Sequence, residues 1–310
     1  MLSDKSERQI LILGFGRMGV SHALQICGIL GARNVAYHVT VVDPSRIARL
    51  AAFSIYGGLL SFKKLDDLWH APDGYYDYAI DATPPSQRFE NVRLLEKISK
   101  RYLVEKPVVA RLGPNGMSGY VLQHNPLINH LASVIATYDL EAIEISLNSN
   151  LRFDDGIGWR AGINGGVINE FLGHLLSVPL ACCQGLTGLS VDRVFRREGA
   201  VETLFKSPLC PLRLTLEYGD ASVRKSTYKW RFVSRDSSVT DYDCYQILTK
   251  SQGSKKSLGL ADLGASVEFY LRGFDFCAQA LALLEGTGDK MDHTQLALID
   301  SLIQQVLEAA

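Results

Sequence analysis

Residues 9–19, QILILGFGRMG, join an apolar run to a glycine-rich turn, and a helical stretch follows. The run QILIL is typical of a strand that is buried on both faces. GFGRMG has the spacing GxGxxG: Gly14 permits a tight turn, Gly16 lets the backbone approach a bound group, and Gly19 lets the helix lie close to the sheet. The stretch therefore predicts a strand, a turn and a helix whose free amides face an anion.

The alternation of apolar strands with helical stretches continues to residue 107. Apolar strand segments recur at HVTVVD (38–43), YDYAIDAT (76–83) and YLVEKP (102–107), and a helix is expected around residues 89–97. Strands of this kind, separated by helices, indicate a parallel sheet covered on both faces. We therefore expect residues 1–120 to form a doubly wound α/β domain of the Rossmann type.

Longer strands with a period of two follow. EAIEISLNS (141–149) alternates apolar and polar residues, and LRLTLEY (212–218) and STYKWRFV (226–233) repeat the pattern, joined by a turn at Gly219 and Asp220. Two helices, at 267–284 and 293–307, close the chain. Residues 121–310 are therefore expected to form an α+β domain with a large, mostly antiparallel open sheet. Such a sheet favours a homo-oligomer, a dimer or tetramer, that assembles through this surface.

Composition limits the possible partners. The chain has 310 residues, 47% of them hydrophobic, and a formal net charge of -1, with acids and bases interspersed. This balance gives no electrostatic footprint for nucleic acid or an anionic membrane surface, so a small-molecule partner is favoured. The first residues are polar, and no run approaches the roughly 20 apolar residues that span a bilayer, so we expect a cytoplasmic protein. Six cysteines and seven histidines show no metal-ligand spacing, and no metal is expected.

Asp43 ends the second predicted strand, where an acid can accept hydrogen bonds from the ribose of an adenosine. Together with the glycine turn, it predicts a dinucleotide cofactor, NAD or NADP. The negative charge of Asp43 would repel a 2'-phosphate and favours NAD, although Ser45 and Arg46 would hold that phosphate if Asp43 turned away. The turn itself contributes Gly14, Phe15, Gly16, Arg17, Met18 and Gly19 to the predicted cofactor site.

Five segments carry a resemblance to a known family. In chain order they are GFGRMG (14–19), VVDPSR (41–46), DATPP (81–85), LVEKP (103–107) and WRAGINGGVINEFLGH (159–174). With these segments the sequence resembles the Gfo/Idh/MocA family of glucose-fructose oxidoreductases and inositol dehydrogenases over nearly the whole chain. The resemblance implies a Rossmann domain that binds NAD(P), a second domain with a large open sheet that covers it, and a sugar or cyclitol bound between them.

The resemblance also implies roles for residues of the first half. Lys106 would reach the oxygen on the reacting carbon and the edge of the nicotinamide, while Glu105 shapes that loop. Thr83 and Pro84 would line the cofactor groove. Tyr120 lies where the family's GYV strand enters the pocket, a position that suits ordinary packing equally well.

In the second half, Trp159 and Arg160 match the WR that leads into the family's substrate pocket. The family pattern of two glycines, an acid and a histidine falls here on Gly165, Gly166, Glu170 and His174. Three positions depart from the family: Glu170 replaces Asp, Leu172 replaces Gly, and Arg88 replaces His. These departures leave the substrate open.

Hydride transfer from an alcohol carbon requires a group that takes the hydroxyl proton. His174 can do so near neutral pH, and Glu170, four residues earlier on a helix, can orient it or bind substrate hydroxyls. Lys106, as a cation, would stabilise a developing alkoxide or polarise a ketone. Each of these residues also has an interpretation without catalysis. Lys106 would be a solvated lysine at a strand end, His174 a core histidine, and Glu170 a helix-capping acid.

The sequence thus predicts an NAD(P)-dependent oxidoreductase that transfers a hydride between nicotinamide and a hydroxyl or keto carbon of a sugar, cyclitol or sugar derivative. One alternative is a non-catalytic protein that senses a dinucleotide or a sugar on the same fold. Another is a reductase of an imine or amino-acid intermediate, in which Arg160 holds a carboxylate.

Overall fold

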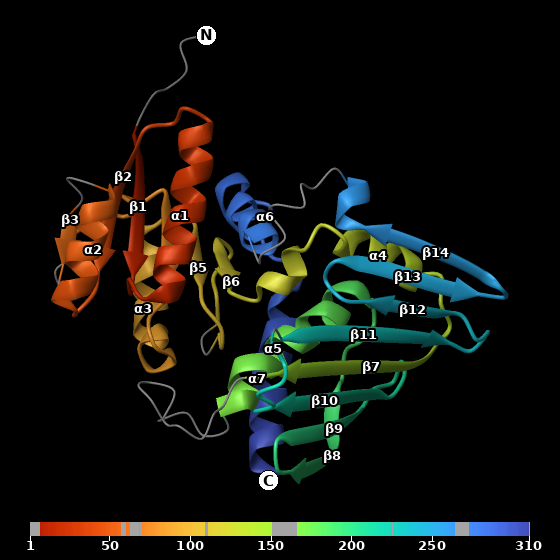
Figure 1. The fold of residues 1–310 in the computed structure, drawn as a ribbon. Helices are drawn as coiled ribbons and strands as arrows, with labels where there is room; N and C mark the ends of the chain where they lie inside the picture. The colour runs from red at the N-terminus through yellow and green to blue at the C-terminus, as the bar shows by residue number, and fades with distance from the viewer. Residues whose placement is uncertain are drawn as a thin grey trace. The chain divides into compact units, whose positions relative to one another are not determined.

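The chain forms two compact units, each with its own sheet (Figure 1). The first comprises Met1–Val121 and Asp275–Asp289, and the second comprises Leu122–Phe274 and Lys290–Ala310. The computed structural model describes residues 7–56, 60–62, 68, 70–108, 111–150, 166–224, 226–263 and 273–309.

The first unit is built on a six-stranded parallel sheet in the order β3-β2-β1-β4-β5-β6. Its strands are β1 (Arg8–Leu13), β2 (Tyr37–Val42), β3 (Leu60–Phe62), β4 (Tyr78–Asp81), β5 (Tyr102–Val104) and β6 (Gly116–Ser118). Ile10 and Ile12 of the central strand β1 are fully buried, as expected for a strand covered on both faces. The strand order reverses between β1 and β4, which confirms the predicted doubly wound Rossmann sheet.

Four helices belong to this unit. They are α1 (Arg17–Ala32), α2 (Arg46–Tyr56), α3 (Pro85–Ile98) and α6 (Gly273–Glu285). The helix expected around residues 89–97 is α3, which begins earlier because Pro85 suits the first turn of a helix. Helix α6 is distant in sequence but packs into the same hydrophobic core, where its Ala280 and Leu283 join Ala23 and Ile26 of α1.

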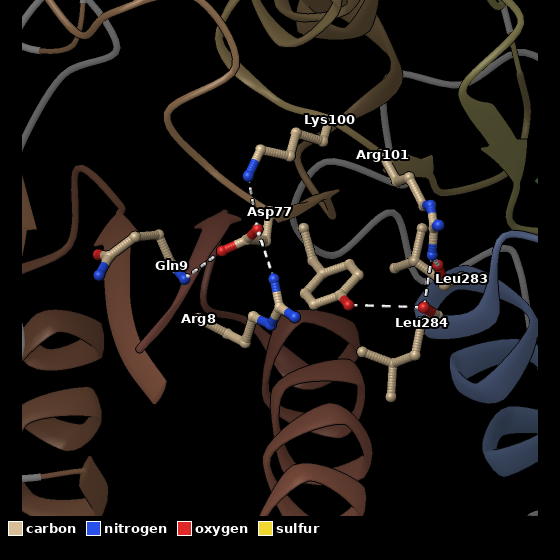
Figure 2. Close-up of polar contacts among 8 residues, drawn as sticks. Arg8, Gln9, Asp77, Lys100, Arg101, Leu283 and Leu284 are labelled. Carbon is tan, nitrogen blue, oxygen red and sulfur yellow. Dashed lines mark hydrogen bonds and ion pairs between the residues drawn. The ribbon is translucent and has the colours of Figure 1, made fainter. Parts of the chain in front are cut away.

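A buried carboxylate ties together the amino ends of the strands (Figure 2). Asp77 Oδ1 accepts hydrogen bonds from Arg8 Nη1 at 3.2 Å and from Lys100 Nζ at 2.9 Å, and Oδ2 accepts the Gln9 N–H at 2.9 Å. Burial alone would raise the pKa of Asp77, but Lys100, the Gln9 amide and Arg8 together lower it below its ordinary value. The ionised side chain therefore fixes this edge of the sheet, and the carboxyl ends of the strands lie at the opposite edge.

The C-terminal end of α6 is held by an arginine that precedes β5. Arg101, just before β5, donates hydrogen bonds to the carbonyl oxygens of Leu283 and Leu284 (Figure 2). The last carbonyls of a helix have no partner within the helix, so this arginine caps them. The contact attaches a segment from near the end of the chain to the first unit.

The second unit contains an eight-stranded sheet in the order β14-β13-β12-β11-β7-β10-β9-β8. Its strands are β7 (Leu140–Ser149), β8 (Ser190–Arg197), β9 (Ala200–Lys206), β10 (Leu212–Tyr218), β11 (Thr227–Ser234), β12 (Val239–Tyr242), β13 (Gln246–Ser251) and β14 (Ser254–Gly259). Among these pairings only β7 with β10 is parallel, so the predicted large, mostly antiparallel sheet is confirmed.

The chain turns at Gly219 and Asp220 as expected, but the two strands that this turn joins do not pair with each other. Strands β10 and β11 both pair with β7, which lies between them in the sheet. The two strands have the alternating pattern of neighbours, but β7 carries the same pattern and its residues Ile143, Ile145 and Leu147 pair with both. The segment after Gly219 therefore connects two strands across a third.

One face of this sheet is covered by helices (Figure 1). These are α4 (Ile128–Ile135), α5 (Gly166–Cys182) and α7 (His293–Glu308), with short 3₁₀ turns at Val121–His124 and Leu260–Leu263. Trp230 of β11 is fully buried and donates its indole N–H to the Leu175 carbonyl of α5 at 2.9 Å. The helix expected at 293–307 is α7, and it buries one apolar stripe: Leu296, Ile299, Leu302, Ile303 and Val306.

The other face of the sheet carries polar and charged residues. Arg231 of β11 forms an ion pair with Asp241 of β12 at 2.8 Å, and Arg213 of β10 forms one with Glu202 of β9 at 3.3 Å. None of the helices that the structure describes is long and apolar enough to cross a membrane.

Candidate functional site

The glycine turn between β1 and α1 has a geometry that side chains would disrupt. Gly14 has φ of +78°, and a Cβ there would lie 2.9 Å from the Ala82 carbonyl oxygen. A Cβ on Gly19 would lie 1.9 Å from the Gly14 carbonyl oxygen, which no rearrangement of side chains can relieve. Both glycines are therefore required by the close approach of α1, β1 and the end of β4.

Gly16 is different, because a Cβ there would meet no protein atom within 4 Å. Its φ of -76° is one that any residue adopts, so neither backbone strain nor packing requires a glycine. The exposed Gly16 is the N-cap of α1, whose first turn contains no acidic residue. The turn thus leaves open space at the positive end of a helix, the arrangement that accommodates a phosphate.

Asp43 follows β2, at the same edge of the sheet. Its Oδ2 accepts the Phe15 N–H at 2.7 Å and its Oδ1 accepts the Ser45 N–H at 2.7 Å. The carboxylate is thereby fixed beside the glycine turn, while each oxygen keeps a lone pair for another donor. Ser45 and Arg46 are exposed at the start of α2, and Phe15 is buried. Arg17 is exposed and Met18 is half-buried on the first turn of α1.

A buried network follows β4. Asp81, which is fully buried, accepts hydrogen bonds from the Thr83 N–H at 3.0 Å, from Thr83 Oγ1 at 2.5 Å and from Asn91 Nδ2 at 3.0 Å. Burial raises the pKa of Asp81, and the hydrogen bonds from Thr83 and Asn91 oppose that rise. The network fixes the turn at Thr83 and Pro84 just before α3 begins.

A buried hydrogen-bonded pair, His22 and Glu105, lies at the end of β5 next to Lys106. Glu105, 3% exposed, accepts a hydrogen bond from His22 Nε2 of α1 at 2.7 Å, and its other oxygen accepts the Lys106 N–H at 3.1 Å. A Cβ on Gly119 would lie 2.7 Å from the Glu105 Cα, so the chain after β6 also presses against this turn. Lys106 is half-buried at the same edge.

The contact between His22 and Glu105 was not predicted from the sequence. His22 is 2% exposed, and its ring lies edge-on to Phe276 of α6, with the centroids 5.5 Å apart. One signal in the sequence could have indicated it. His22 lies about one turn after Gly19, on the face of α1 that packs on the sheet, and a buried ionisable residue needs a polar partner.

This pair predicts a pH-dependent contribution to stability. Burial would raise the pKa of Glu105, but His22, Lys106 and Arg88 lower it from 4.5 to about 2. Because the folded pKa is depressed, the stabilisation is complete above about pH 4.5 and is lost as the pH falls toward about 2. We expect Glu105→Gln to lower the free energy of unfolding by on the order of 3 kcal/mol near pH 7, and the deficit to shrink in acid.

Urea unfolding of wild type and Glu105→Gln across this pH range measures the effect. Glu90→Gln, at an exposed position of α3, is the matched control and should match the wild type. A deficit that stays constant from neutral to acidic pH would show that the charge of Glu105 does not stabilise the fold.

The second unit carries the other predicted catalytic residues. Glu170 and His174 are half-buried on α5 and, four residues apart, lie on one face of the helix. Ser177 donates its hydroxyl to the His174 carbonyl oxygen at 2.7 Å. Leu172, which replaces the glycine of the family pattern, is fully buried. Trp159, Arg160 and Gly165 lie outside the described residues, and Gly166 begins α5.

Tyr120 belongs to the first unit, just after β6, and is 1% exposed. In the first unit the structure therefore brings the glycine turn, Asp43, Thr83 and Lys106 to the carboxyl edge of one parallel sheet. The pair Glu170 and His174 is brought together separately, on α5 of the second unit.

In the described part of the chain, no three His, Cys, Asp or Glu side chains gather as a metal site would require. Burial raises the pKa of Cys182 to about 12 and that of Cys210 to about 11, which keeps both thiols protonated and unreactive.

Comparison of the whole chain with known proteins gives matches in structure alone. No family model matches the sequence, and no curated protein is similar to it. The structure is similar to a levoglucosan dehydrogenase solved with NADH and L-sorbose, with a TM-score of 0.80 and 11% identity over 98% of each chain.

Two further structures are similar. One is an oxidoreductase from Agrobacterium radiobacter in complex with NAD⁺, L-tartaric acid and magnesium (TM-score 0.74, 12% identity, 98% of each chain). The other is GenD2 from gentamicin A biosynthesis in complex with NAD (TM-score 0.72, 14% identity, 99% of this chain and 95% of that one). Over nearly its whole length, the chain has the fold of these dehydrogenases and oxidoreductases.

Proposed function

We propose that the protein is an NAD(P)-dependent oxidoreductase that transfers a hydride between nicotinamide and a hydroxyl or keto carbon of a sugar, cyclitol or sugar derivative. The observation that carries the proposal is the carboxyl edge of the first sheet. There the open turn at Gly16 provides room for a pyrophosphate, and Asp43 lies beside it with lone pairs for a ribose. Lys106 lies two residues beyond the end of β5 at the same edge.

NAD is the favoured cofactor. A 2'-phosphate would approach Asp43, whose charge repels it, and Arg46 would help only if Asp43 turned away. Turning would break the hydrogen bonds from Phe15 N–H and Ser45 N–H, and bonds to a charged acceptor are worth about 1.5–3 kcal/mol each. The fixed carboxylate therefore supports NAD over NADP.

In this proposal each residue of the site has its own role in hydride transfer. The nicotinamide, when bound, supplies or accepts the hydride. Lys106 stabilises the negative charge that develops on the substrate oxygen, and His174 takes or returns the hydroxyl proton. Glu170 orients His174 or binds a substrate hydroxyl, and Tyr120, Trp159 and Arg160 complete the substrate site.

The sugar-type substrate is supported by two solved structures, both of a levoglucosan dehydrogenase. Similar structures have been solved with levoglucosan and with L-sorbose.

The polar face of the eight-stranded sheet, with its charged pairs, is proposed as the surface through which copies of the chain assemble.

Cofactor binding and turnover test the proposal in sequence. Titration with NADH and NADPH, followed by the fluorescence of the reduced ring, should give tighter binding of NADH. NAD⁺ with a panel of polyols, and NADH with a panel of keto-sugars, should then change the absorbance of the reduced nicotinamide. Absence of NADH binding would refute the proposal, and binding without turnover on the panel would favour the sensor.

A further inference from the structure

Arg88 is a charged residue inside the first unit. It lies on the inward face of α3 and is 3% exposed. A buried guanidinium needs acceptors for its donors, because an unsatisfied buried charge is strongly destabilising. The acceptors that Arg88 uses are main-chain carbonyls of two turns far apart in sequence.

The guanidinium joins these turns as a fork. Nε and Nη2 donate to the Thr83 carbonyl oxygen at 3.0 and 2.7 Å, after β4. Nη1 donates to the Pro107 carbonyl oxygen at 2.8 Å, after β5. The planar fork of arginine can reach both turns at once, which a lysine ammonium with one centre cannot do with the same geometry.

The main chain joins the two strand ends as far as Glu105, whose N–H donates to the Asp81 carbonyl oxygen at 2.9 Å, and each turn beyond has anchors of its own. The Thr83 turn is tied to Asp81 and to Asn91, whose Nδ2 donates to Thr83 Oγ1 at 2.9 Å. The Pro107 side is anchored through the Lys106 N–H bond to Glu105. Arg88 is therefore a direct link between a turn at the predicted cofactor groove and the turn that carries Lys106.

The charge of Arg88 also matters to its surroundings. Burial raises the pKa of Asp81, and Arg88 is one of the groups that oppose this rise; Arg88 also helps His22 and Lys106 to lower the pKa of Glu105. Arg93, on the same helix, is different. It is exposed and stacks over the Phe89 ring, with Cζ 4.9 Å from the centroid.

We propose that Arg88 is a positioning residue that ties the Thr83 turn to the Pro107 turn and thereby fixes Lys106 for hydride transfer. The link between the turns stands on the contacts alone, whereas its catalytic consequence rests on the proposed function. Arg88 does not touch substrate in this role. It acts through Lys106, one residue from the carbonyl that it holds.

Amide hydrogen exchange without cofactor tests the link. In Arg88→Met, the amides of Thr83 and Lys106 should exchange about tenfold faster or more, since each turn loses a charge-assisted bond. Arg88→Lys keeps the charge and should protect only one of the two turns. Arg93→Met is the control and should exchange as the wild type does. Unchanged exchange at both turns in a folded Arg88→Met protein would overturn the proposal.

Kinetics of the same variants test the consequence. With a substrate from the panel, Arg88→Met should lower kcat by on the order of 100-fold, because a shift of about 1 Å in a catalytic group costs that much. The KM for that substrate and the binding of NADH should change far less, and Arg88→Lys should restore part of kcat. An unchanged kcat would overturn the positioning role. Failure of the wild type to bind NADH would instead refute the proposed function, and the exchange data would still decide whether Arg88 links the turns.

Discussion

Gly16→Val is expected to weaken NADH binding strongly and to leave the protein folded. A Cβ at Gly16 meets no protein atom within 4 Å, and the backbone there is one that valine adopts, so stability should fall only by the cost of a poorer N-cap residue, on the order of 1 kcal/mol. The added methyl groups would instead occupy the space into which a pyrophosphate must come. We expect the Kd for NADH to rise on the order of 100-fold, which corresponds to about 2.8 kcal/mol.

Fluorescence titration with NADH and thermal unfolding measure the two quantities. Gly19→Ala is the informative counterpart, because its Cβ would lie 1.9 Å from the Gly14 carbonyl oxygen. That variant should lose about 3 kcal/mol or more of stability, as expected for overpacking against the main chain. If Gly16→Val bound NADH as tightly as the wild type, the dinucleotide would not bind at this turn.

The second large effect is expected at Lys106 and His174. Lys106→Met and His174→Ala should each lower the rate of hydride transfer by about 100-fold to 10,000-fold, because each removes charge stabilisation or proton transfer from the transition state. Neither residue is needed for the glycine turn or Asp43, so NADH should still bind. Single-turnover measurements at saturating NAD⁺ separate the chemical step from binding.

Each variant has a matched control in its own unit. Lys97→Met removes an exposed lysine of α3, and His130→Ala removes an exposed histidine of α4. Both should turn over like the wild type. Full turnover in Lys106→Met would mean that the lysine is a solvated strand-end residue, and full turnover in His174→Ala would mean that the histidine belongs to the core.

The sequence predicted those features that depend on long, regular patterns. The apolar runs around Ile10 and Ile80 and the alternation in β7 were sufficient to assign a parallel and a mostly antiparallel sheet. Strands β3 and β6 were not predicted, because each has only three residues, too few to show a hydrophobic period. The turn at Gly219 was predictable, but the insertion of β7 between β10 and β11 was not, because pairing partners that are distant in sequence leave no local signal.

The site was predictable where a motif places the main chain and not where side chains meet across elements. Gly14 and Gly19 have the steric roles expected from their spacing. The bond between His22 and Glu105 joins residues 83 positions apart, and Arg88 reaches the carbonyl of Pro107 across two turns. Neither contact follows from residue type or spacing, because both depend on how α1 and α3 pack on the sheet.

The return of α6 to the first unit bears on how this protein can be divided or recombined. A fragment that ends at residue 121 would leave out Ala280, Leu283 and Leu284 and expose the apolar surface of α1 that they cover. A chimera with an exchanged second half would have the same defect. The smallest version of the first unit that keeps its core therefore contains residues 1–121 and 275–289, joined by a designed linker. Residues 122–274 are then an insertion into this unit.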